Sequence, residues 1–271
     1  MTISLSDIRP RTATLPPRIL IHGREGVGKA TLASRFPNPV LIDLEGGVPS
    51  GISIPGFGRM GAVQDIYDAV MALGRGLPEE PHGYRTVIVD SVDRLEPLVW
   101  AAVTAANGWA SMESPGFGKA YVMTDWHWVR VLNGLDWLRA LGMTVVLLAH
   151  SAAEMVSDPR AASYTSYQLR VHRRARGILQ DWADAIGFLA TDVVVHSEDI
   201  GFNKTRGRGD GGNTRWLHWE ARPAFVAKNR YGLPATARRD AKRSLFILAP
   251  CAKKYFDHVK RLPAPWLSAS F

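Results

Sequence analysis

The residues Gly23-Arg-Glu-Gly-Val-Gly28-Lys29 have the G-x-x-x-x-G-K spacing of a P-loop, and this motif predicts the architecture around it. A short β-branched run at residues 18–22 stands directly before it and is typical of a buried strand. A helical stretch at residues 29–35 follows, and Pro37 ends it. In such a loop the backbone N–H groups turn inward around phosphate oxygens, and the helix N-terminus adds its positive dipole end. The sequence therefore predicts a phosphate site at this turn.

The loop and the first helical turn are the expected nucleotide contacts. They comprise Gly23, Arg24, Glu25, Gly26, Val27, Gly28, Lys29, Ala30 and Thr31. Lys29 places a point charge on the β- and γ-phosphates. The motif has Ser or Thr after the lysine, whose hydroxyl binds Mg²⁺, and here Ala30 stands in that place. Thr31 follows, but it points about 100° further around the helix. Two alternatives stay open: other groups and water hold Mg²⁺, or binding and hydrolysis are weak.

Three polar residues are expected to complete the site from the ends of neighbouring strands. Asp90 ends an apolar run in the manner of a Walker B strand, and we expect it to orient water on Mg²⁺. Glu45 follows another strand and is placed to orient or deprotonate the attacking water. His150 ends a third strand and could hydrogen-bond the γ-phosphate. The alternatives are a solvated loop acid for Glu45 and a polar cap on a core strand for His150.

Strands and helices alternate along the chain, which predicts an α/β fold with a largely parallel sheet. The expected strands are residues 18–22, 40–43, 86–90, 144–149 and 185–195, with further strand-like runs at 214–220, 224–227 and 244–248. The expected helices are residues 29–35, 60–73, 94–106 and 126–141. Three segments have the composition of loops: 107–124, 151–167 and the glycine-rich 200–213.

Composition narrows the class of protein. The 271 residues are 46% hydrophobic and 21% charged, which excludes wholesale disorder, collagen and coiled coil. The single cysteine, Cys251, excludes a disulfide framework and a cysteine-based zinc cluster. There is no apolar run of membrane-spanning length and no secretory signal pattern, so we expect a cytoplasmic protein without a membrane partner.

The positive charge is concentrated at the end of the chain. Residues 1–200 contain 18 Lys and Arg against 21 Asp and Glu, whereas residues 201–271 contain 15 against 4. The net charge is therefore −3 for the first part and +11 for the second. Such asymmetry is typical of chains that bind nucleic acid or carry a basic tail.

The combination of motifs resembles RecA-type ATPases. The P-loop, Leu-Ile-Asp-Leu-Glu-Gly-Gly at 41–47, Ile-Val-Asp-Ser-Val-Asp at 88–93 and Leu-Leu-Ala-His at 147–150 follow in RecA order. Lys228-Asn-Arg-Tyr-Gly232 resembles the K-N-R-F-G motif of RadA-type proteins and the paired lysine and arginine fingers of DnaB-type ring helicases. Most similar are the compact phage RecA-like ATPases associated with recombination and single-strand annealing. The resemblance covers roughly residues 18–234.

The resemblance implies roles for the late motif and for two DNA-binding segments. Lys228 and Arg230 would be fingers that reach the γ-phosphate on a neighbouring subunit, the alternative being a basic hairpin facing solvent or DNA. Residues 112–125 and 151–176 are similar to the family's DNA loops, with Tyr164 and Tyr167 as candidates for stacking on bases. The basic residues expected to contact DNA phosphates are Lys119, Arg170, Arg173, Arg174, Arg176, Lys204, Arg206 and Arg208. For the arginines, the alternative is a solvated helix face.

The resemblance also implies a domain organisation and a function. It consists of an N-terminal arm (1–17), a RecA-like P-loop NTPase core (18–250) with the finger motif at 226–234 and a C-terminal β-hairpin segment, and a tail (251–271). The chain would be an oligomerising, single-stranded-DNA-binding ATPase that uses ATP and Mg²⁺, with a single-strand-binding or annealing protein as a further partner. If the chain is phage-encoded, it would act in a bacterial host. The alternative suggested by Ala30 is a nucleotide-dependent DNA-binding or loading module with little hydrolysis. A P-loop kinase is disfavoured, because it needs neither the fingers nor the basic segment.

Overall fold

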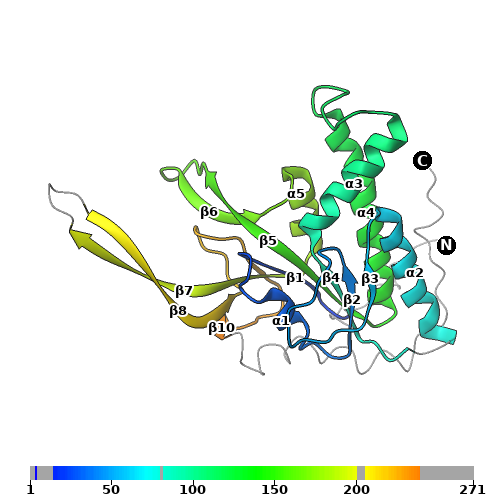
Figure 1. Ribbon diagram of the computed structural model, residues 1–271, viewed down its shortest axis with the longest axis horizontal. Helices are drawn as coiled ribbons and strands as arrows, with labels where there is room; N and C mark the ends of the chain where they lie inside the picture. The colour runs from blue at the N-terminus through cyan, green and yellow to red at the C-terminus, as the bar shows by residue number, and fades with distance from the viewer. Residues whose placement is uncertain (1–3, 5–14, 80–81, 200–204, 239–271) are drawn as a thin grey trace.

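A ten-stranded sheet forms the centre of the molecule (Figure 1). The computed structural model describes residue 4 and residues 15–79, 82–199 and 205–238. The strands are β1 (Arg18–Gly23), β2 (Pro39–Asp43), β3 (Gly56–Arg59), β4 (Thr86–Asp90), β5 (Thr144–Val156), β6 (Tyr164–Leu169), β7 (Ala185–Asp199), β8 (Thr205–His218), β9 (Lys228–Asn229) and β10 (Thr236–Arg238). The helices are α1 (Lys29–Ala33), α2 (Val63–Glu79), α3 (Val92–Asn107), α4 (Lys119–Ala140) and α5 (Arg173–Trp182).

The core of the sheet is parallel. The order is β10-β8-β7-β1-β5-β4-β2-β3, with β6 paired to β5 and β9 to β7. Strand β1 pairs in parallel with both β5 and β7, and β4 pairs in parallel with β5 and β2. The carboxyl ends of these strands therefore meet at one edge, where an α/β sheet binds its ligands. The predicted α/β class, a mostly parallel sheet flanked by helices with late hairpin strands, is confirmed.

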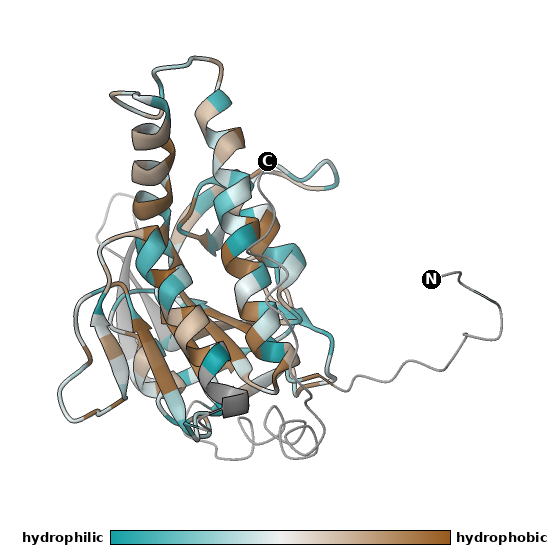
Figure 2. Cartoon of the chain, turned by 90° about the vertical axis from the view of Figure 1, so that its right-hand side faces the viewer, coloured by the Kyte–Doolittle hydropathy of each residue, from teal (hydrophilic) through white to brown (hydrophobic). Residues whose placement is uncertain are grey.

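Alternate residues of each strand face two different layers of helices. On one face Leu20, Val87 and Leu147 pack with α2, α3, α4 and α5, and on the other Ile19, Ile21 and Ile88 pack with α1. In Figure 2 the strands are largely brown, and the helices in front of them carry brown and teal residues on different sides. This burial on both faces explains why the central strands have continuous apolar sequences rather than alternating ones.

Two long antiparallel hairpins extend beyond the parallel core, and α3 and α4 project from it together (Figure 1). Residues 151–167, predicted as a loop, instead continue β5 and turn back as β6, in register from Ser151↔Leu169 to Val156↔Tyr164. Most of the predicted loop 200–213 is likewise strand, because β8 begins at Thr205 and pairs with β7 along its length. Both loop predictions were wrong because backbone hydrogen bonds hold these ribbons, and such ribbons need few apolar side chains.

Other elements differ in extent. Helix α4 begins at Lys119, inside the predicted loop 107–124, and α2 runs on to Glu79. Residues 224–227 form isolated bridges around Phe225 rather than a strand. The run 244–248, almost all of the arm 1–17 and the whole tail 251–271 lie outside the described residues. Among the helices of the described part, none is long and apolar enough to cross a membrane.

Candidate nucleotide site

The P-loop connects β1 to α1 at the carboxyl edge of the sheet. Gly28 is the residue before the helix and has φ 93°, and Gly26 has φ 70°, a left-handed backbone that favours glycine. Gly23 is required for a different reason, because a Cβ there would lie 2.3 Å from the carbonyl oxygen of Leu189 on β7. The glycines thus let the loop curl tightly against the neighbouring strand.

Lys29 points into the loop. Its side chain is buried, and its ammonium donates hydrogen bonds to the carbonyl oxygens of Gly23 and Arg24, both at 3.2 Å. Burial lowers the pKa of Lys29, and the nearby carboxylates of Asp90 and Glu45 oppose that change. A buried cation at the centre of a loop of glycines is suited to a polyanionic phosphate chain.

Asp90 lies at the end of β4, as predicted, with 6% of its surface exposed. Burial, together with the charge of Glu45, raises the pKa of Asp90 to about 7. Such an acid gains from a nearby cation, because a positive charge compensates for the water that it has lost. Asp90 therefore fits the part of a magnesium-site acid.

Glu45 and His150, predicted from separate strands, meet beside Asp90. The Nδ1 atom of His150 lies 3.3 Å from Oε1 of Glu45, and that same oxygen accepts a hydrogen bond of 2.9 Å from the hydroxyl of Ser91. Asp93, in the first turn of α3, accepts hydrogen bonds from the backbone N–H of His150 at 2.8 Å and from its Nδ1 at 2.9 Å. Glu45 is thus bonded to its neighbours at the ligand edge, with 30% of its side chain exposed.

The residues present fit a nucleoside triphosphate. The loop offers the left-handed Gly26 and Gly28 and the buried Lys29, while Asp90 and Glu45 supply acid oxygens for a metal ion. The fit to Mg²⁺ lacks the customary hydroxyl ligand, because the methyl group of Ala30 packs against the apolar cluster around α1. When bound, Mg²⁺ would neutralise charge on the phosphates, and Asp90 would be its ligand, directly or through water. Nothing in the described structure assigns Thr31 to the metal.

A cavity of about 430 Å³ adjoins the tip of the P-loop. The loop residues Arg24 to Val27 form one wall, and Phe188 to Thr191 of β7 form another. Tyr167 of β6 closes it and stacks on Phe188, with ring centroids 5.2 Å apart. Tyr167, a predicted candidate for stacking on DNA bases, is therefore a wall of this cavity.

Lys228 and Arg230 lie at the opposite edge of the sheet. Asn229 is in register with Ala185 at the start of β7, and the N–H of Arg230 donates to the carbonyl of Asp184. Asp184 lies beside Arg18, the first residue of β1. Arg18 precedes Gly23, where the P-loop begins, by five residues, so the two ends of the strand are about 16 Å apart. The Arg230 side chain therefore cannot reach the P-loop of its own chain. Lys228 is in register with Ile186, further along β7, and its ammonium contacts the end of α5 instead.

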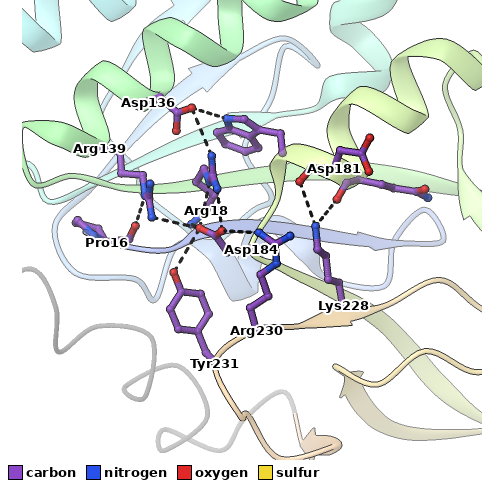
Figure 3. Close-up of polar contacts among 11 residues, drawn as sticks. Pro16, Arg18, Asp136, Arg139, Asp181, Asp184, Lys228, Arg230 and Tyr231 are labelled. Carbon is purple, nitrogen blue, oxygen red and sulfur yellow. Dashed lines mark hydrogen bonds and ion pairs between the residues drawn. The ribbon is translucent and has the colours of Figure 1, made fainter. Parts of the chain in front are cut away.

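Both residues have contacts within the chain at that edge (Figure 3). The ammonium of Lys228 donates to the carbonyl oxygens of Gln180, at 2.7 Å, and Asp181, at 3.1 Å, in the last turn of α5. Arg230 lies 3.6 Å from Asp184, and 58% of its side chain is exposed. Asp184 also pairs with Arg18 at 2.8 Å and Arg139 at 3.3 Å. Arg230 is thus the more accessible of the two cations.

The residues expected to bind DNA have diverse surroundings. Arg170 pairs with Glu25 and Asp93 at the nucleotide site, Arg174 with Asp125, and Arg176 with Glu154, so these three guanidiniums are engaged within the chain. Lys119 and Arg173 begin α4 and α5 and are exposed. Arg206 and Arg208 belong to β8, and Lys204 lies outside the described residues.

Sequence reasoning missed three residues of the site. Asp93 and Ser91 belong to the quoted stretch 88–93, and their position just after Asp90 was the available signal. His22 gave none. Its buried ring bonds to the hydroxyl of Ser151 at 2.9 Å and the carbonyl of Val226 at 2.8 Å, and burial lowers its pKa to about 4. It links the strand before the P-loop to the segment that leads to Lys228.

The strand–loop–helix turn, its buried lysine and the acid on the neighbouring strand define a P-loop nucleoside triphosphatase fold. A family model described as AAA domain matches residues 15–231, so the chain belongs to this family of P-loop ATPases. A search of curated proteins finds no match to the sequence.

Proposed function

We propose that the chain is an ATPase that hydrolyses ATP between copies of itself, with Lys29, Asp90, Glu45 and His150 acting from one copy and Arg230, assisted by Lys228, from the next. Within this proposal Lys29 binds the phosphates and Asp90 holds Mg²⁺. Glu45 orients the attacking water, and His150 contacts the terminal phosphate. The RecA-type resemblance of the motif order is part of the same proposal.

The observation that carries the proposal is the separation of Arg230 from its own P-loop by the height of the sheet. Charge that develops on the transferred phosphoryl group needs fixed cations around it. Arg230 is exposed at an edge that already holds Arg18, Arg139 and Lys228 near Asp184. Asp136 and Asp181 lie at the same edge, so among the described residues four cations face three acids there and Arg230 is the exposed cation. An exposed arginine of this kind suits the triphosphate of a second copy, and head-to-tail contacts build rings or filaments.

The dependence of turnover on protein concentration tests this function. Turnover per protomer is expected to rise with concentration and level off once assembly is complete. Arg230→Ala is expected to leave nucleotide affinity unchanged and keep turnover low at every concentration. Arg222→Ala, which removes another exposed arginine of the same segment, is the matched control. Turnover that is independent of concentration and still requires Arg230 would contradict a role across the interface.

Single-stranded DNA is the proposed polyanionic partner. The support is the net charge of +11 over residues 201–271 and the exposure of Lys119 and Arg173. Contacts to phosphates give affinity that falls steeply with salt. Replacing both Lys119 and Arg173 by alanine should weaken DNA binding and flatten its salt dependence by about two phosphate contacts. Arg75→Ala, which removes an exposed arginine of α2, should change neither.

Ala30 favours a second candidate, a nucleotide-dependent binding module with little hydrolysis. Its methyl group packs against the core where the motif has a hydroxyl for Mg²⁺. In that case the unmodified protein would bind ATP with negligible turnover, and Ala30→Thr would raise both turnover and its Mg²⁺ dependence. DNA-stimulated turnover of many cycles in the unmodified protein would exclude this candidate.

A further inference from the structure

Arg170 joins the nucleotide site to the β5–β6 hairpin. It follows directly after β6, and its backbone N–H donates to the carbonyl of His150 at 2.9 Å. Both ends of the hairpin are therefore at the carboxyl edge of the sheet, with the rest of the ribbon projecting from it (Figure 1). The guanidinium of Arg170 hydrogen-bonds two carboxylates, Glu25 through one nitrogen and Asp93 through the other, the latter at 3.1 Å.

The two acids differ in what surrounds them. Asp93 is fixed by His150, and its side chain is 3% exposed. Glu25 is at the tip of the P-loop, and its side chain is 70% exposed, with Arg170 as its ion-pair partner. The hydrogen bond from Arg170 lowers the pKa of Glu25, so the acid stays ionised. An ionised acid in a phosphate-binding loop repels phosphate, and this chain neutralises it with a guanidinium.

Arg170 lies within the charge cluster that surrounds Lys29. Both of its partners, Asp93 and Glu25, are among the acids whose charges act on the Lys29 ammonium. Arg174 and Arg176, in the following helix, pair instead with Asp125 on α4 and Glu154 on β5. Of these three arginines, Arg170 is the one paired with a P-loop residue.

We propose that Arg170 binds the terminal phosphate of a nucleoside triphosphate on its own chain, and that Glu25 holds the guanidinium while no triphosphate is bound. This inference rests on the proposed function of the site. A terminal phosphate carries more charge than one exposed carboxylate and accepts the planar guanidinium at two oxygens, so it competes well for Arg170. Asp93 keeps hold of the second nitrogen, so the guanidinium changes one partner without leaving the site.

The test is the preference for triphosphate over diphosphate, measured as the ratio of the dissociation constants of ADP and a non-hydrolysable ATP analogue. Arg170→Gln is expected to reduce this ratio about tenfold, since it removes one charge-assisted hydrogen bond that ADP does not make. Arg170→Lys keeps the charge and should retain part of the preference. Arg174→Gln is the matched control, because its side chain is 40% exposed against 41% for Arg170 and also pairs with an acid.

Glu25→Gln supplies the second half of the test. Removing the competing carboxylate is expected to strengthen binding of the ATP analogue. The gain from Glu25→Gln should be larger in the wild-type background than in the Arg170→Gln background. An unchanged ratio in Arg170→Gln would overturn the role of Arg170. Equal effects of Glu25→Gln in both backgrounds would overturn the competition. Wild-type protein that binds neither nucleotide would instead refute the proposed function itself, and this inference with it.

Discussion

Asp93 accepts two hydrogen bonds from His150, one from the backbone N–H at 2.8 Å and one from Nδ1 of the ring at 2.9 Å. Burial alone would raise the pKa of Asp93, but the hydrogen bonds from His150 and Arg170 outweigh it and hold that pKa well below its ordinary range. An ionised Asp93 requires a proton on Nδ1, so Nε2 is the ring nitrogen available to the nucleotide. In the proposed function, the pair would thus present Nε2 of His150 to the terminal phosphate.

Asp93→Asn tests this orientation. The asparagine amide can present an N–H toward Nδ1, which favours the opposite tautomer of the imidazole. Turnover is expected to fall about 100-fold, with a much smaller change in affinity for ADP. Asp125→Asn alters an acid of α4 that pairs with Arg174. It should leave turnover near that of the wild type. Equal turnover of the two variants would remove His150 from the mechanism.

Lys29→Ala is expected to abolish tight nucleotide binding without loss of stability. The ammonium is buried, and burial lowers its pKa, so the folded protein gains little from it when the nucleotide is absent. Affinity for a fluorescent ATP analogue should fall at least about 100-fold, whereas the urea midpoint should stay the same or rise. Unchanged affinity would rule out the P-loop as the phosphate site.

The Asp184 cluster is predicted to matter for stability. Asp184→Ala leaves Arg18 and Arg139 without their shared carboxylate, and these guanidiniums have side chains only 19% and 16% exposed. The free energy of unfolding should fall by about 3 kcal/mol, as it does when one partner of a buried pair is removed. Asp158→Ala breaks a surface pair with Arg160, whose side chain is 88% exposed, and should change the free energy of unfolding far less. Similar losses for the two variants in urea unfolding would contradict the assignment.

Glu96 is expected to make stability depend on pH. Burial raises its pKa from 4.5 to about 7, while a hydrogen bond from the backbone of His172 opposes the rise. Because the protonated acid is favoured in the folded state, its contribution is complete below pH 4.5 and is lost as the pH rises through 7. Glu96→Gln keeps the acceptor for His172. As the pH rises from 5 to 8, the free energy of unfolding should fall by about 2 kcal/mol less in this variant than in the wild type. Parallel pH profiles of the two proteins would contradict this role.

The parts that could be predicted from sequence are those with a local physical signature. The P-loop has a fixed spacing of glycines and lysine, and the strand before Asp90 is a continuous apolar run. Both were therefore predicted at the carboxyl edge of the sheet, where the structure has them. Glu45 and His150 followed from the rule that parallel strands end at one edge. The two ribbons, β5–β6 and β7–β8, were missed because pairing between distant backbones leaves little trace in side-chain pattern.

The pairing of charges could not be predicted either. Arg170 and Glu25 are 145 residues apart, and their ion pair depends on where the β5–β6 hairpin ends. The same holds for Lys228, which contacts the carbonyl groups that end α5 because β9 pairs with the first residues of β7. Sequence gives the inventory of arginines and lysines, but tertiary structure decides which acid or carbonyl each one meets.

Mixing two inactive variants shows whether one copy completes the nucleotide site of another. Lys29→Ala lacks the P-loop cation but keeps Arg230, and Arg230→Ala has the reverse defect. Each should be inactive alone, and an equal mixture should recover about a quarter of wild-type turnover, the share of intact interfaces after random head-to-tail mixing. A mixture as inactive as its components would show that Arg230 does not act at the nucleotide site of a neighbouring copy.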